Sequence, residues 1–166
     1  MEPYPLASLL MVRQYREESA KRRVRSAETA LREAEEQVQR QQKALEEYRL
    51  WRKEEEDRRY AAIMNIPMSL EELDNFKAGL ALMASEETNL EQAVIQARKI
   101  VEDRRTELEK AKEAAKIAGK NTSKIQAHKD IWKEEAKKEA EHKEDLELEE
   151  FRPISRKGAE AEGEDV

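Results

Sequence analysis

The sequence has no cysteine and few of the residues from which a broad hydrophobic core is built. Among its 166 residues there are four glycines and four prolines, and 5% of the residues are aromatic. Without cysteine, the chain can form neither disulfide bonds nor thiolate metal sites. Charged residues make up 42% of the sequence, against roughly a quarter in an average globular domain. Because the strong helix formers Ala, Glu, Lys, Arg, Leu and Gln dominate, the composition favours long helices with a narrow apolar seam.

The N-terminal stretch lacks the features of a leader peptide or a membrane span. In MEPYPLASLLMVRQY a short apolar run follows an acidic residue, whereas a leader peptide begins with basic residues. A membrane-spanning helix needs about 20 apolar residues, and this run is much shorter. We therefore expect a cytoplasmic protein without direct membrane insertion.

No constellation of residues typical of catalysis or metal binding is present. The two histidines, His128 and His142, are too far apart in the sequence to act as ligands on one helical turn. The acidic runs EEED (54–57) and EDLELEE (144–150) lack the glycine turn of a calcium loop. There is no glycine-rich phosphate loop, and long helices with a narrow apolar seam offer no pocket for a nucleophile and its base. We predict that the protein is not an enzyme and needs no cofactor or metal.

The charge distribution argues against nucleic acid as a partner. The net charge is -6, with 14 Lys+Arg against 13 Asp+Glu in residues 1–64 and 18 against 25 in residues 65–166. The basic cluster RQYREESAKRRVR ahead of heptads resembles the plan of a basic-zipper DNA-binding protein. However, Glu17 and Glu18 interrupt it, and the acidic second half would repel phosphates. A solvated helix face is the favoured interpretation of the cluster.

The stretch NIPMSLEE (65–72) predicts a turn between two helices. Pro67 disfavours helical dihedral angles in the residue before it, so one helix should end here. Ser69 and Glu72 have the spacing of a capping box, in which each side chain accepts a hydrogen bond from the backbone N–H of the other residue. A second helix should therefore begin at this point.

Apolar residues recur with the 3.5-residue period of a coiled coil on both sides of the turn. Stepping by three and four residues gives Ala20, Val24, Ala27, Leu31, Ala34, Val38, Gln41, Leu45 and Tyr48 before the turn, and Leu73, Phe76, Leu80, Met83, Glu87, Leu90, Val94, Ala97, Val101, Arg104, Leu108, Ala111, Ala115, Ala118, Thr122 and Ile125 after it. The seam is rich in alanine, and its polar members Gln41, Glu87 and Arg104 should weaken it. We expect marginal stability for the isolated chain.

These patterns predict an all-α fold, a long antiparallel two-helix coiled-coil hairpin with its turn near residues 65–69. We expect one domain over 1–152, with helices over about 5–64 and 69–150, and a flexible tail over 153–166. An intermolecular coiled coil is the competing architecture, which the short link between the helices disfavours.

The antiparallel register gives Trp132 an expected environment. A turn at Pro67 pairs residues whose numbers sum to roughly 134. Leu6 and Leu10 then lie close to Ile131 and Trp132 at the open end of the hairpin, where Leu9 and Tyr4 are further candidate neighbours of Trp132. Trp132 either plugs that end or offers apolar surface to a partner, and an amphipathic ring can do both.

The stretches YPLASLLMVRQYREESA and HKDIWKEEAKKEAEHKE make the chain resemble the type III secretion stalk proteins of the YscO/CdsO group, whose flagellar counterpart is FliJ. The resemblance implies a central stalk similar to the coiled-coil part of the rotary ATPase gamma subunit. The end with the chain termini would enter the hexameric secretion ATPase, and another part would contact the cytoplasmic ring of the export gate. It further implies contacts with export chaperones and a peripheral position at the inner-membrane secretion apparatus.

Two sets of residues are candidates for these contacts. The first is the expected ATPase-binding end, which combines apolar and basic side chains: Leu6, Leu9, Leu10, Arg13, Arg16, Ile131 and Trp132. The second is the export-gate contact of the flagellar relatives, whose spacing falls here on Phe76, Leu80, Met83 and Glu87. Met83 replaces a small residue of that pattern and Glu87 replaces a histidine. All four also lie on the expected seam, so a purely structural role is equally open to them.

Two functions therefore remain open from the sequence. One is a stalk that couples a secretion ATPase to an export gate. The other is a stand-alone coiled-coil tether or an escort protein for export chaperones.

Overall fold

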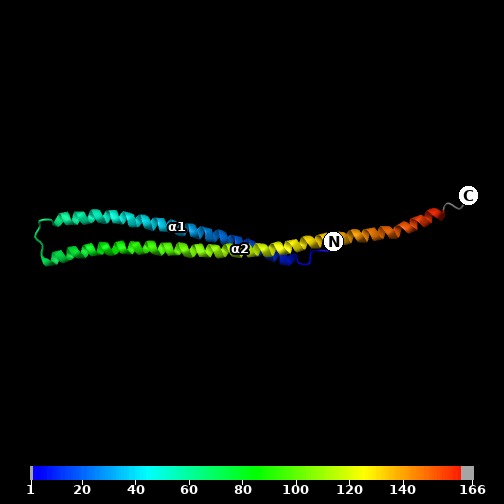
Figure 1. Ribbon diagram of the computed structural model, residues 1–166, viewed down its shortest axis with the longest axis horizontal. Coiled ribbons are helices and arrows are strands. Elements are labelled where there is room, and N and C mark those ends of the chain that lie inside the picture. Colours follow the sequence, from blue (N-terminus) through cyan, green and yellow to red (C-terminus); the bar gives the residue numbers. More distant parts are fainter. Residues whose placement is uncertain (1, 162–166) are drawn as a thin grey trace. The chain divides into compact units, whose positions relative to one another are not determined.

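The computed structural model describes residues 2–161 of the chain, and the side chains of residues 2–151. In this part the regular secondary structure consists of two helices, α1 (Ala7–Ile63) and α2 (Leu70–Ala161). The helices pack against each other in opposite directions and are joined by one short turn (Figure 1). The prediction of an all-α antiparallel hairpin is confirmed.

The local sequence accounts for the length of both helices. α1 spans 57 residues and contains neither glycine nor proline. α2 spans 92 residues and runs through Gly119 without a break, although each glycine costs about 1 kcal/mol relative to alanine in a helix interior. A Cβ atom on Gly119 would lie 3.5 Å from Oε1 of Glu17, an ordinary van der Waals distance, so packing against Glu17 does not require glycine here.

The end of α1 is set by the residues ahead of Pro67. Asn65 adopts a left-handed conformation with φ of 61°, which asparagine tolerates better than most residues. The backbone N–H of Ile66 donates to the carbonyl oxygen of Ile63 at 3.2 Å. The chain thereby leaves the helix at Ile63, one residue before the expected end near 64.

The start of α2 has the two hydrogen bonds of a capping box. The N–H of Glu72 donates to Oγ of Ser69 at 3.1 Å, and the N–H of Ser69 donates to Oε2 of Glu72 at 3.4 Å. The N–H of Leu73 donates to the carbonyl oxygen of Ser69 at 3.0 Å. Ser69 is therefore the N-cap residue, and the helix proper begins at Leu70.

The contacts of the chain form two compact units. Unit 1 comprises Met1–Ser19 and Ala115–Val166, and unit 2 comprises Ala20–Ala114. α2 ends at Ala161 and not near 150, so the tail expected over 153–166 is helical over 153–161. Residues 162–166 of that tail lie outside the described residues.

Unit 2 is a two-stranded coiled coil with a thin core. Every seam position expected in this unit is buried or half-buried, and the most buried members are Ala20, Ala34, Leu45, Met83, Val94, Ala97, Val101 and Leu108. The rings of Tyr60 and Phe76 lie 5.2 Å apart, and Tyr48 is hydrogen-bonded to Met83. The residue numbers of these two pairs sum to 136 and 131, in agreement with the expected register. Burying a leucine or valine contributes roughly 1.5 to 3 kcal/mol, whereas the seam alanines contribute much less.

Unit 1 contains the N-terminal segment, the first turns of α1 and the last part of α2. Tyr4 and Leu10 are its buried apolar residues. The hydroxyl of Thr122 lies 3.1 Å from the carbonyl oxygen of Arg13 on α1 and 3.1 Å from that of Ala118. Beyond this contact α2 continues past the N-terminal segment (Figure 1). All side chains over 137–151 are exposed.

Candidate functional site

Tyr4, in the N-terminal segment of unit 1, packs against α2. Its hydroxyl lies 2.6 Å from Nδ1 of His128, and its ring lies 5.4 Å from that of Trp132 at 58°. Only 7% of Tyr4 is exposed. Pro3 and Pro5 flank it, and because proline favours extended backbone before it, the segment reaches α2 before α1 begins.

Apolar side chains around this contact remain exposed. Leu10 is buried, whereas Leu6 and Leu9 are exposed and Ile131 is 60% exposed. Trp132 is half-buried. All the expected apolar residues thus belong to unit 1, and they divide into buried or half-buried members, Leu10 and Trp132, and exposed ones.

The two arginines of this set have different environments. Arg16 is exposed and Arg13 is half-buried. Nε of Arg13 is buried without a hydrogen-bond partner among the described residues. An unpaired buried donor is costly, so this Nε destabilises the fold slightly, and only the rest of the Arg13 guanidinium could reach a carboxylate of a partner.

The four residues of the expected export-gate contact face α1. The ring of Phe76 packs edge-to-face on Tyr60 at 72°, and Leu80 is half-buried. Met83 is 5% exposed, and its carbonyl oxygen accepts a hydrogen bond of 3.1 Å from the Tyr48 hydroxyl. These side chains belong to the seam, so a partner could contact only their outer edges.

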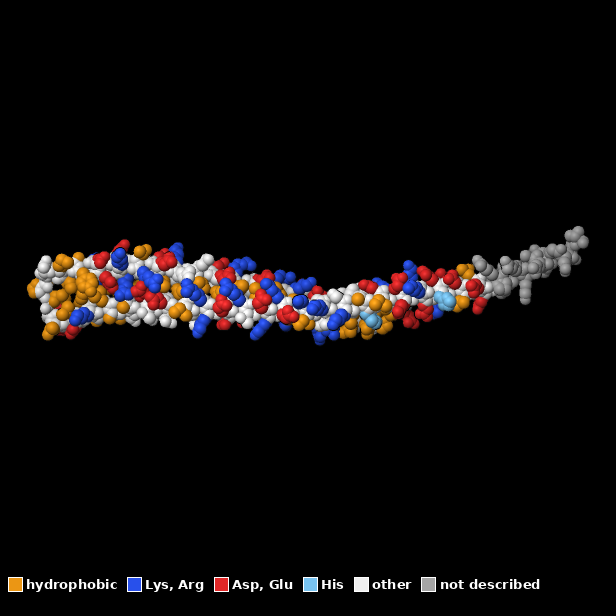
Figure 2. All heavy atoms as spheres, in the orientation of Figure 1, with side chains coloured by type: hydrophobic (Ala, Val, Ile, Leu, Met, Phe, Trp, Pro, Cys, Tyr) orange, Lys and Arg blue, Asp and Glu red, His pale blue; other side chains and the backbone are white. Residues whose placement is uncertain are grey.

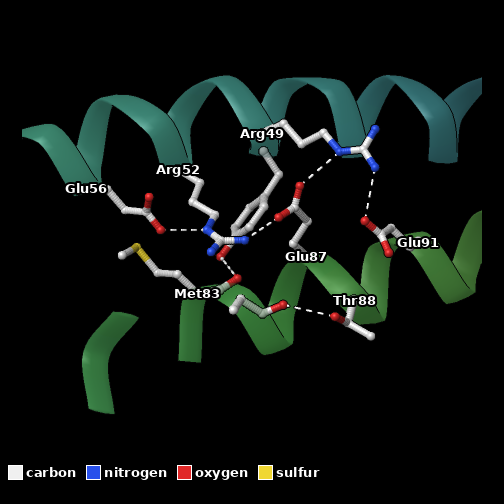
Figure 3. A network of polar contacts seen from close by, with 9 residues as sticks. Arg49, Arg52, Glu56, Met83, Glu87, Thr88 and Glu91 are labelled. Carbon is white, nitrogen blue, oxygen red and sulfur yellow. Dashed lines mark hydrogen bonds and ion pairs between the residues drawn. The ribbon is translucent and has the colours of Figure 1, made fainter. Parts of the chain in front are cut away.

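Glu87, the fourth member of this set, is the centre of an ion-pair network between the helices (Figure 3). One carboxylate oxygen accepts from Nε of Arg49 at 2.9 Å, and the other pairs with Arg52. Arg49 also pairs with Glu91 at 3.0 Å, and Arg52 pairs with Glu56 at 2.8 Å. The side chain of Glu87 is 19% exposed.

This network changes the protonation behaviour of its members. The hydrogen bond from Arg49, and to a smaller extent that from Arg52, holds the pKa of Glu87 below its ordinary value of 4.5. The carboxylates in turn raise the pKa of both arginines. The sequence interpretation counted Glu87 as a weakness of the seam. The signal that was missed is the register, which places an acidic residue opposite Arg49 and Arg52.

A second aromatic pair lies on α1 in unit 2. The rings of Tyr48 and Trp51 are 5.4 Å apart, and Trp51 is partly exposed. Burial and the nearby charge of Glu86 raise the pKa of the Tyr48 phenol. The pair was not singled out from the sequence, although a tryptophan three residues after a seam tyrosine predicts such a contact.

Exposed apolar side chains also gather around the turn of unit 2. Met64, Ile66 and Tyr60 are exposed, and Leu70 is 81% exposed. Figure 2 shows hydrophobic side chains at this place, while charged side chains of both signs cover the visible helix surface of unit 2. The turn is therefore a second apolar surface available to a partner.

Two kinds of site do not occur in the part of the chain that the structure describes. No group of three or more His, Cys, Asp or Glu side chains there could hold a metal ion. Neither helix, over the same residues, has a stretch long and apolar enough to cross a bilayer.

Comparisons with known proteins identify the family of this chain. The family model for type III secretion protein YscO matches residues 6–153. The crystal structure of type III secretion protein YscO from Vibrio parahaemolyticus is 28% identical, with a TM-score of 0.83, and the match covers 89% of this chain and 92% of that one. No curated protein sequence gives a match.

A second solved structure shares the fold at lower identity. The YscO homologue CT670 from Chlamydia trachomatis is 20% identical with a TM-score of 0.74, and the match covers 97% of this chain and 99% of that one. This likeness extends over almost the full length of both chains.

Proposed function

The chain belongs to the YscO family of type III secretion proteins, and we propose that it is the non-enzymatic central stalk of its secretion system. In this proposal unit 1 inserts into the hexameric secretion ATPase, and the region around the turn links the ATPase to the cytoplasmic ring of the export gate. The protein acts in the cytoplasm, peripherally at the inner-membrane secretion apparatus. Export chaperones are further proposed partners.

The observation that carries the proposal is the uncovered apolar surface of unit 1. Leu6, Leu9 and Ile131 are exposed in unit 1, the unit in which Tyr4 packs on Trp132. Tryptophan, tyrosine and arginine are the residue types that supply most of the affinity at protein interfaces, and this surface offers Trp132 together with these aliphatic neighbours. Arg13 and Arg16 lie on the first turns of α1, and arginine can pair bidentately with carboxylates of the ring. The surface suits the lumen of a protein ring better than solvent.

The proposed action of the stalk on the ATPase is allosteric. A single hairpin inside a hexamer has no sixfold symmetry, so it cannot make identical contacts with six subunits. Any effect on turnover must come from contacts that differ between the conformational states of those subunits. The protein itself supplies no catalytic group in this account.

The proposed gate contact follows the turn in the sequence. Phe76, Leu80, Met83 and Glu87 are engaged with α1, so a gate contact through this segment relies on exposed neighbours. Leu70 and Leu82 are exposed apolar residues of the same part of α2. Binding energy at the gate should therefore come from these neighbours and from the outer edges of Phe76 and Leu80.

Binding to the cognate ATPase tests the stalk function. Trp132→Ala should weaken the complex by about 2 kcal/mol or more, as is typical of an aromatic hot spot. Trp51→Ala is the matched control, because it removes the chain's other tryptophan from unit 2, and it should leave binding unchanged. Circular dichroism of each variant checks that the helices are intact.

Two outcomes would contradict the proposal. If Phe76→Ala abolishes ATPase binding while Trp132→Ala binds as the wild type does, the turn region and not unit 1 enters the ring. If the wild-type chain neither binds the ATPase nor alters its turnover, a stand-alone tether or an escort for export chaperones becomes the better description.

A further inference from the structure

An open groove lies beside Trp132 in unit 1, on the stretch of α2 that has no helical partner. Its volume is about 650 Å³, and it is lined by Glu2, Trp132, Glu135, Ala136, Glu139, Ala140 and Lys143. Trp132, Ala136 and Ala140 follow one another at four-residue intervals, so they share one face of the helix. The two alanines let a partner's backbone approach closely along that face.

The charged side chains of the groove are mostly acidic. Three carboxylates face one ammonium group, and Nζ of Lys143 lies 3.6 Å from Oε1 of Glu139. Both members of that ion pair are more than two-thirds exposed, so it is weak. No ion pair joins Glu2 or Glu135 to another of the described residues. The groove therefore has an excess of negative charge beside an apolar surface.

Trp132 is held in place at the edge of this groove. Tyr4 packs on its ring, and Tyr4 is itself hydrogen-bonded to His128. A tryptophan in a fixed position loses little conformational entropy when a partner binds. Its π-face is the best of the aromatic surfaces for a cation.

We propose that this groove receives a basic segment of the secretion ATPase, with an arginine or lysine placed against Trp132 and between Glu2 and Glu135. This inference rests on the proposed function, because it names the chemistry of the surface that unit 1 meets in the ring. Charge complementarity selects this occupant, since the carboxylates would repel an anionic lipid surface, a nucleic acid or an acidic helix.

Neutralising the carboxylates tests the inference without disturbing the helix. The double variant Glu135→Gln with Glu139→Gln keeps side-chain size and helix propensity. Its association rate constant with the cognate ATPase, measured by surface plasmon resonance at low salt, should fall about threefold to tenfold. The difference from the wild type should vanish at 1 M salt, where the Debye length is about 3 Å. The control is Glu147→Gln, an exposed position of the same helix outside the groove, which should bind as the wild type does.

The outcomes separate this inference from the function on which it rests. If the double variant binds the ATPase as the wild type does at every salt concentration, the proposed role of the groove is wrong, while the stalk function is unaffected. Tighter binding of the double variant would overturn it as well, because the groove would then meet an acidic surface. Failure of the wild-type chain to bind the ATPase at all would overturn both. A stronger loss with Glu135→Lys than with Glu135→Gln would support a cationic occupant.

Discussion

The hydroxyl of Tyr4 lies 2.6 Å from Nδ1 of His128, although 124 positions separate the two residues. The N–H of Ala7 donates to the carbonyl oxygen of Tyr4 at 3.2 Å, so the same residue also precedes the first turn of α1. Tyr4 thus joins the beginning of one helix to the interior of the other. The ring of Tyr4 also covers one side of Trp132.

Removing Tyr4 in two steps should separate its hydrogen bond from its packing. Tyr4→Phe deletes the hydroxyl and keeps the ring, which should cost about 0.5 to 1.5 kcal/mol of unfolding free energy. Tyr4→Ala removes the ring from Trp132 as well and should cost roughly 3 kcal/mol. Urea denaturation of both variants measures the two steps. Equal stability of Tyr4→Ala and the wild type would show that the N-terminal segment contributes nothing.

Loss of the capping box should destabilise the start of α2. Ser69→Ala leaves the N–H of Glu72 without its side-chain acceptor, and the expected cost is about 1 kcal/mol. Ser85→Ala is the control, because Ser85 is exposed in the interior of α2, where alanine is the better helix former. Thermal unfolding should show a lower midpoint for the first variant only. A reversed order of the two midpoints would contradict the assigned cap.

The Glu87 network should make stability depend on pH. Because the pKa of Glu87 is lowered in the folded state, its contribution is fully present above the ordinary value of 4.5 and is lost as the pH falls through the folded-state pKa. Glu87→Gln should therefore be less stable than the wild type at pH 7. The gap should close as the pH falls below 4.5.

The control for this prediction is Glu46→Gln, at an exposed position of α1 outside the network. Its stability should follow that of the wild type from pH 7 down to pH 3. A gap between Glu87→Gln and the wild type that is constant over this range would be inconsistent with the ionised network, and would indicate a packing effect.

The sequence predicts the hairpin because its strongest signals are local or periodic. Pro67, Ser69 and Glu72 locate the turn within a few residues. Once the turn is known, chain connectivity fixes the antiparallel register. The 3.5-residue period then identifies the seam, since it holds over most of both helices.

The polar contacts across the hairpin were harder to predict. Glu87 interrupts an apolar series, and only its pairing with Arg49 and Arg52 turns it into a stabilising residue. Tyr4 lies before α1 and outside any heptad. The register places it near Trp132, and the two rings are in contact, but periodicity gives no information about its hydrogen bond with His128. The groove beside Trp132 combines Glu2 with residues of α2. In each case the information lies in residues distant in sequence that only the folded chain brings together.

The most direct test of the central claim, that unit 1 enters the secretion ATPase, is site-specific crosslinking. The chain has no native cysteine, so Ile131→Cys and Leu70→Cys each carry one reactive thiol. Both positions are well exposed, at 60% and 81%. They lie in unit 1 and at the start of α2 in unit 2, respectively.

Each variant is labelled with a thiol-linked benzophenone, mixed with the assembled cognate ATPase hexamer and irradiated. The account predicts a covalent adduct with the ATPase from Ile131→Cys, and little or none from Leu70→Cys. An adduct from Leu70→Cys in the absence of one from Ile131→Cys would contradict it, because the turn would then be the part of the chain inside the ring.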